Sequence, residues 1–96
     1  MDQNMLRRIQ KMQKEIQNKT EEFHQKEFSE EKYGLEVVAT GEKRIVSIKI
    51  KDQDLIDPDD AQTLEDLMKL VINQLFSKID EEQEKLMPQM PGGFGF

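Results

Sequence analysis

Four cationic side chains near the amino terminus are the residues whose type and spacing most suggest a chemical role. On a helix, Arg7, Lys11 and Lys14 fall at positions i, i+4 and i+7 and share one face, with Arg8 beside it. Such a row can neutralise several phosphates of a nucleic-acid backbone, which is the sequence-independent part of that binding. From these residues alone, a solvated helix face with lysines in local ion pairs remains an open alternative.

A second, smaller cationic group is formed by Lys43 and Arg44 in an expected hairpin turn, with Lys49 and Lys51 on the strand that follows. These side chains are candidates for secondary phosphate contacts. Charge at a turn or strand edge also discourages aggregation, and we favour this explanation for them.

Residue patterns typical of catalysis or metal binding are missing from the sequence. His24 is the only histidine, and there is no cysteine. The acids between Asp52 and Asp60 lack the glycine and distal glutamate of a calcium loop. No Ser-His-Asp set, glycine-rich phosphate loop or paired-carboxylate cleft is present. We therefore expect no enzymatic activity, no catalytic residues, no cofactor, no metal and no small-molecule substrate.

Composition indicates one small, highly charged domain. Of the 96 residues, 35% are hydrophobic and 35% charged, so the core must be thin and a homodimer is expected. No apolar run is long enough for a bilayer and no signal sequence is recognisable, which favours a cytoplasmic protein without a membrane partner.

The net charge of −6 is unevenly distributed. Residues 1–20 have five basic and two acidic side chains (+3), whereas residues 52–87 have three and eleven (−8).

The elements that must position these groups begin with a long helix, expected over residues 1–28. Its apolar residues recur at intervals of four and three, with Lys19 in one expected apolar position, a heptad seam typical of helices that pair: Met5, Ile9, Met12, Ile16 and Phe23. Both an ordinary amphipathic core helix and a projecting coiled-coil-like arm fit this narrow seam.

A β-hairpin is expected over residues 32–51. Leu35, Val37 and Ala39 alternate with other residues, and Val46, Ile48 and Ile50 do the same, which predicts an antiparallel pair with one buried face. Gly41 is expected to take a positive φ in the connecting turn. A lone hairpin is marginal in water, so pairing of its edge with a second copy would also favour a dimer.

A second long helix is expected over residues 57–87, with Asp57 as N-cap and Pro58 in the first turn. Its broad apolar stripe predicts the main core. Asn73 interrupts that stripe, either at a dimer interface or, as we favour, on the polar face. Residues 1–87 would then form a single domain, and residues 88–96, rich in Pro, Gly and Phe, a flexible tail.

Several of these segments, in this order, resemble the bacterial YbaB/EbfC family of nucleoid-associated proteins. The resemblance covers roughly residues 5–85 and depends on the segments Ile9–Gln17, Val46–Ile50, Leu55–Asp60, Leu64–Leu67 and Ile72–Asn73, and on the closing tail. Three departures from the family pattern are a reduced glycine-rich approach at 31–34, a less alanine-rich stretch at 70–75, and Ser77-Lys78 in place of a basic pair. The last departure weakens the case for DNA contacts from the final helix.

The resemblance implies an α/β protein of the α+β type, in which long helix, hairpin and long helix follow one another. It implies a homodimer with a sheet joined across the two copies and with helical arms that project from it. The implied function is nucleoid-associated binding of double-stranded DNA with relaxed sequence preference, for chromosome organisation or transcription modulation. We assign the DNA contacts to Arg7, Arg8, Lys11, Lys14, Lys43 and Arg44. The alternative is a coiled-coil-type protein-interaction module that does not bind DNA directly.

Overall fold

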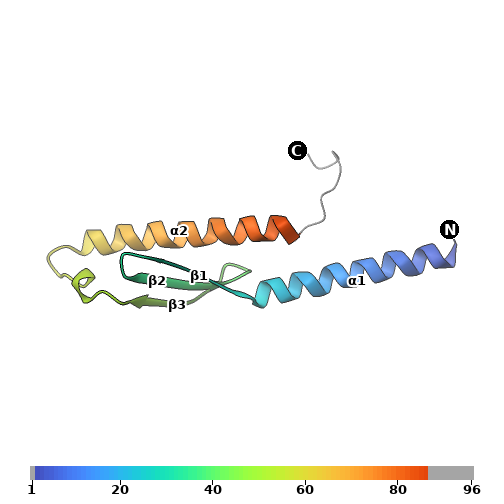
Figure 1. Cartoon of the computed structure of the whole chain (residues 1–96), viewed down its shortest axis with the longest axis horizontal. Coiled ribbons are helices and arrows are strands. Elements are labelled where there is room, and N and C mark those ends of the chain that lie inside the picture. Colours follow the sequence, from blue (N-terminus) through green and yellow to red (C-terminus); the bar gives the residue numbers. More distant parts are fainter. Residues whose placement is uncertain (1, 87–96) are drawn as a thin grey trace.

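The computed structural model describes residues 2–86, and in it a three-stranded antiparallel sheet joins two long helices (Figure 1). The elements follow in the order α1 (Gln3–Gln25), β1 (Glu27–Lys32), β2 (Leu35–Thr40), β3 (Ile45–Ile50), the 3-10 helix η1 (Gln53–Leu55) and α2 (Ala61–Leu86). The predicted α+β class is confirmed. The molecule measures 70 × 26 × 14 Å, because α2 lies along the sheet while α1 extends away from it. The predicted tail, residues 88–96, lies outside the described residues.

Strand β1 is an element that the sequence pattern did not predict. We expected a helix to residue 28 and the hairpin from residue 32, whereas α1 ends at Gln25 and β1 pairs with β2 from Glu27 onwards. Its sequence contains one large apolar residue, Phe28, among glutamates and lysine, which favour helices. Pairing with β2 and burial of Phe28 override this local preference.

The turn between β1 and β2 consists of Tyr33 and Gly34, both with positive φ (53° and 83°), as a two-residue hairpin turn requires. In the turn between β2 and β3, the residue with positive φ is Lys43, at 66°. The prediction that Gly41 would take this conformation was wrong. A side chain is excluded at Gly41 for another reason, because its Cβ would lie 1.9 Å from the backbone oxygen of Phe23. The sheet touches the end of α1 at this glycine.

Helix α2 provides one side of the core, as its apolar stripe predicted. The residues it buries recur every four positions: Leu67, Val71, Leu75 and Ile79. They pack across β1 and β2, and the inward-facing residues of β2 are completely buried: Leu35, Val37 and Ala39. This single layer of contacts holds the sheet on the helix. Asn73 is exposed on α2, which fits both the polar face and a dimer interface, so the preference between them stays a prediction.

The start of α2 differs from the prediction. Asp57 accepts a hydrogen bond from the backbone N–H of Asp59 and forms a turn before the helix, which begins at Ala61. Asp60 is the capping residue, since its carboxylate accepts from the backbone N–H of Thr63 at 3.3 Å and from its hydroxyl at 2.6 Å. The capping chemistry was correctly expected, but three residues too early.

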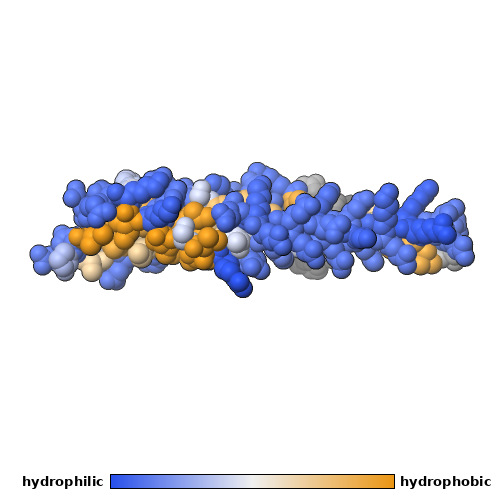
Figure 2. All heavy atoms as spheres, turned by 90° about the horizontal axis from the view of Figure 1, so that it is seen from below, coloured by the Kyte–Doolittle hydropathy of each residue, from blue (hydrophilic) through white to orange (hydrophobic). Residues whose placement is uncertain are grey.

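The apolar face of β3 is not buried within the protomer. Ile45, Val46 and Ile48 are 41%, 51% and 41% exposed, although the alternation predicted a buried face. The reason is that α2 packs mainly against β1 and β2 and leaves β3 at the edge of the sheet uncovered. Seen from below, an apolar patch lies over the strand region of the molecule (Figure 2).

Candidate nucleic-acid interface

Helix α1 projects from the sheet. Of the two interpretations of its seam, this favours the projecting arm over the core helix. Phe23 is the one buried residue of the helix, and it packs against Phe28 with ring centroids 5.4 Å apart. This aromatic pair and the contact with Gly41 anchor the base of the arm. Residues 2–19 are all exposed. At the far end, the carboxylate of Asp2 caps the helix by accepting from the backbone N–H of Asn4 at 2.7 Å.

The cationic row lies on the exposed part of this arm. Arg7, Lys11 and Lys14 are on one face over about 10 Å of helix, and Arg8 is beside them. Within residues 2–86 none of these four side chains forms an ion pair with a carboxylate. The alternative in which Lys14 is held in a local ion pair therefore finds no support in this part of the chain, and the four cations remain available to an external anion.

The row and the apolar seam occupy opposite faces of α1. Each cation of the row is two positions from a seam residue, as Lys11 is from Ile9 and Lys14 is from Met12. Two positions correspond to a rotation of about 200° on an α-helix. In the view from below, the part of the molecule formed by α1 is predominantly hydrophilic (Figure 2). A ligand on the cationic face would leave the seam free.

Lys43 and Arg44 are not part of the same cluster. Their turn lies at the base of the arm, where Gly41 touches the end of α1, and Arg7 is about 24 Å further along the helix. Lys43 forms an ion pair with Asp80 of α2. This pair agrees with a structural role for the lysine, the explanation favoured from the sequence.

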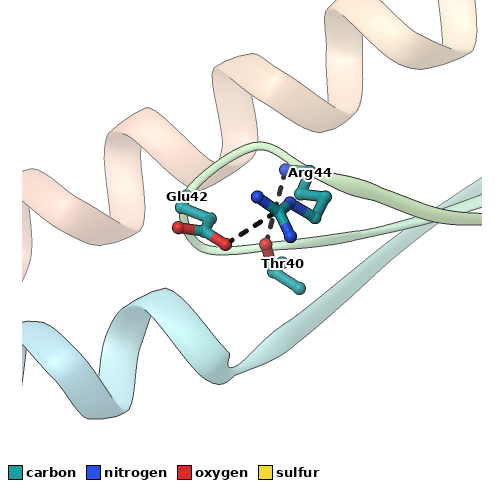
Figure 3. A network of polar contacts seen from close by, with 3 residues as sticks. All are labelled: Thr40, Glu42 and Arg44. Carbon is teal, nitrogen blue, oxygen red and sulfur yellow. Dashed lines mark hydrogen bonds and ion pairs between the residues drawn. The ribbon is translucent and has the colours of Figure 1, made fainter.

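Arg44 is more exposed, and its contacts stay within its own turn (Figure 3). Its Nε lies 3.7 Å from a carboxylate oxygen of Glu42, and its side chain is 78% exposed. Its backbone N–H donates to the hydroxyl of Thr40 at 3.4 Å. Of the two predicted turn residues, Arg44 is thus the one whose charge is presented to solvent.

Lys51 is held by carboxylates on neighbouring strands. Its Nζ lies 3.3 Å from Glu31 and 3.6 Å from Glu36. The hydrogen bond and the charge of Glu31, followed by the charge of Glu36, raise the pKa of Lys51 above its ordinary value of 10.5. These contacts connect the ends of β1, β2 and β3, which supports a structural role for Lys51.

The acids of this chain do not assemble into a metal site in the part that the structure describes. Within residues 2–86, no group of three or more His, Cys, Asp or Glu side chains could hold a metal ion. His24 is half-buried near the carboxyl end of α1. In the same residues no helix is long and apolar enough to cross a membrane.

Sequence reasoning missed two exposed apolar surfaces. One is the uncovered face of β3. The other is a groove where the end of α2 lies beside α1, lined by Met12, Ile16 and Leu86 together with neighbouring polar side chains. Periodicity identified Val46, Ile48, Met12 and Ile16 as apolar residues of these surfaces but not Ile45 or Leu86, and only the packing shows that the surfaces remain exposed.

Fold and site together define a small α+β protein with a projecting cationic helix. The model of the YbaB/EbfC DNA-binding family matches residues 1–94, and the chain belongs to this family. It is 42% identical to a nucleoid-associated protein of Mycoplasmopsis pulmonis over 89 residues, covering 93% of this chain and 88% of that protein. Nucleoid-associated proteins of Clostridium kluyveri and Streptococcus agalactiae are 37% and 34% identical, covering 94% and 98% of this chain and 80% and 96% of those proteins. The family description names DNA binding and no catalytic activity.

Proposed function

We propose that this chain is a nucleoid-associated protein of the cytoplasm that binds double-stranded DNA as a homodimer with relaxed sequence preference. In that role it organises the chromosome or modulates transcription. The observation that carries the proposal is the exposed row Arg7, Lys11 and Lys14, with Arg8 beside it, on an arm that projects from the sheet; no carboxylate in residues 2–86 pairs with it. Membership of a DNA-binding family supports it.

Affinity would come from release of the counterions that surround the DNA backbone, which requires clustered cations and no base-specific groups. A protein with net charge −6 repels DNA unless its cations are concentrated in one region. Projection of α1 carries its amino-terminal part, where Arg7 and Arg8 lie, beyond the end of the acidic helix α2 (Figure 1). A two-fold axis would present two such rows to one duplex.

The homodimer is supported by the contrast between the two edges of the sheet. The outer edge of β1 is guarded by charge, since three of its six residues are glutamates and Lys78 of α2 donates to the backbone oxygen of Ser29 at 3.1 Å. The edge strand β3 instead exposes Ile45, Val46 and Ile48. Exposed apolar strand edges are templates for pairing with another chain.

Helix α2 extends the apolar surface beside β3. The half-buried residues Met68, Ile72 and Phe76 each follow a residue of the buried stripe by one position, whereas Lys78, which contacts β1, precedes one. One position is a rotation of about 100° on a helix, so this half-buried row lies on the side of α2 away from β1. Pairing of two β3 strands would cover the strand edge and this row together.

The DNA-binding proposal is tested by mobility shift with two duplexes of unrelated sequence. The wild type should bind both at low salt, and Arg7→Glu/Arg8→Glu/Lys11→Glu should lose binding to both. Unchanged binding by the triple variant would remove the proposed site.

The dimer is tested by light scattering at micromolar concentration. Ile48→Asp should convert the dimer to a monomer, because it inserts a charge at the apolar edge of β3. Tyr33→Asp is the matched control, since Tyr33 is 78% exposed in the other hairpin turn and should leave the dimer intact. A wild-type monomer would contradict the dimer, and a dimer that survives Ile48→Asp would remove this interface.

The protein-interaction module remains the second candidate, and the exposed seam of α1 is the observation that favours it. Apart from the buried Phe23, its apolar residues are between 41% and 60% exposed: Met5, Ile9, Met12 and Ile16. Absence of DNA binding by the wild type at low salt would favour this candidate.

A further inference from the structure

The seam of α1 is open except at the groove beside the end of α2. Leu86, the last described residue of α2, lines this groove with Met12 and Ile16, and it lines a second depression beside Phe23. Towards the amino terminus of α1, the seam continues through Ile9 to Met5 without cover from the described residues. An apolar strip of this length on a charged arm calls for a partner.

The direction of α2 indicates where the chain goes next. Helix α2 runs antiparallel to α1; its carboxyl end lies beside the base of the arm, the carboxyl-terminal part of α1, and points towards the amino terminus of α1 (Figure 1). Leu86 therefore lies at the start of the open seam, and the axis of α2 points along it (Figure 1). A segment that follows Leu86 needs no reversal to reach Ile9 and Met5.

The ten residues that follow have the composition and the reach to cover this seam. They carry no charged side chain and include four large apolar ones: Met87, Met90, Phe94 and Phe96. The open seam from Ile16 to Met5 is about 16 Å long on an α-helix. Ten residues span up to about 33 Å when extended, so even a bent path suffices.

We propose that residues 87–96 dock on the apolar seam of α1 in the same chain and cover Met5, Ile9 and Met12. Charge favours this occupant over the arm of a second copy. Residues 1–20 have a net charge of +3, so two paired arms would repel each other, whereas an uncharged segment would not. The end of α2 also lies beside the base of the seam, on the path that a second long helix would take.

Docking on the seam does not depend on DNA binding. The cationic row is on the opposite face of α1, about 200° away, so the docked segment would leave Arg7, Lys11 and Lys14 exposed. Its role would be to stabilise an arm that is otherwise a lone helix anchored at one end by Phe23.

The test uses the full chain with Phe94→Trp, since the sequence contains no other tryptophan. Docking predicts a blue-shifted emission and slow acrylamide quenching, relative to the isolated peptide of residues 87–96 with the same substitution. Adding Ile9→Gln/Met12→Gln should shift the emission to the red and speed the quenching. Lys11→Gln/Lys14→Gln, on the opposite face of the same turns, is the matched control and should change neither.

Hydrogen exchange provides a second measurement that needs no substitution in the seam. The amides of residues 5–16 should lose protection in a chain that ends at Leu86, while those of α2 over the sheet should keep theirs. Emission equal to that of the free peptide, or unchanged exchange on truncation, would overturn the proposal.

A mixing experiment separates docking within one chain from docking between two copies. The Phe94→Trp chain with the altered seam is mixed with an excess of wild-type chain. Emission that stays red-shifted supports docking in the same chain. Recovery of the blue shift would show docking on a second copy and overturn the proposal.

Discussion

If the cationic row contacts DNA as proposed, the number of cations in it sets how steeply the affinity falls with salt. Four exposed cations on each arm would give eight in the proposed dimer: Arg7, Arg8, Lys11 and Lys14 of both copies. If all eight contact phosphates of a duplex, log K should fall with log salt with a slope of about −7. Arg7→Gln/Lys11→Gln removes four of the eight, and the slope should fall to about −4. Between 50 and 200 mM salt, the wild type would then lose about 10⁴-fold in affinity and the variant about 10²-fold.

The assay is fluorescence anisotropy of a labelled duplex across a salt series, for the wild type and the variant. Lys32→Gln/Lys69→Gln is the charge-matched control, because it removes the same number of cations from β1 and α2 and none from the arm. Its slope should equal that of the wild type. Equal slopes for all three proteins, at preserved helix content, would refute the assignment of phosphate contacts to the arm. Equal reductions in both variants would show that net charge matters and the row does not.

Three further outcomes follow from the packing. Leu75→Ala should destabilise the fold by about 2–5 kcal/mol in urea unfolding, because Leu75 is completely buried, whereas Leu70→Ala, at a 41% exposed residue, should cost much less. Gly41→Ala should cost about 1–3 kcal/mol in the same assay, since its Cβ would overlap the backbone at the end of α1; wild-type stability would contradict this contact. The contacts that raise the pKa of Lys51 stabilise the fold at pH values below 10.5, the ordinary pKa of lysine. This contribution is lost as the pH rises through the higher pKa that Lys51 has in the folded state. Lys51→Met should therefore flatten the alkaline decline of the urea midpoint more than Lys49→Met does.

The helices were predicted from the sequence because their patterns are long and periodic. The stripe through Leu67, Val71 and Leu75 repeats over many turns, so one misassigned residue does not change the result. The ends of the helices were less well predicted. Several acids before α2 have equal capping chemistry, and only the folded chain shows that Asp60 caps the helix and Asp57 does not.

Strand β1 could not be predicted in the same way, because its formation depends on pairing with β2, in another part of the chain. Phe28 opposite Ala39 and Glu30 opposite Val37 pair only when β2 is present. Local preference in Glu27–Lys32 is for a helix, and it is outweighed by the ladder and by burial of Phe28. With one large apolar residue in six, β1 shows no alternation from which a strand could be recognised.

The sequence alone determined the order of helix, strands and helix, the cationic row on one face of the first helix and the apolar seam on its other face. These properties depend on spacing along one element, which the chain carries regardless of its tertiary contacts. The tertiary structure decided which faces stay exposed. Because α2 is wide enough to cover only β1 and β2, the apolar face of β3 remains open. Because Phe23 is the one residue that α1 buries, the cations and the seam from Met5 to Ile16 are left exposed by the rest of residues 2–86.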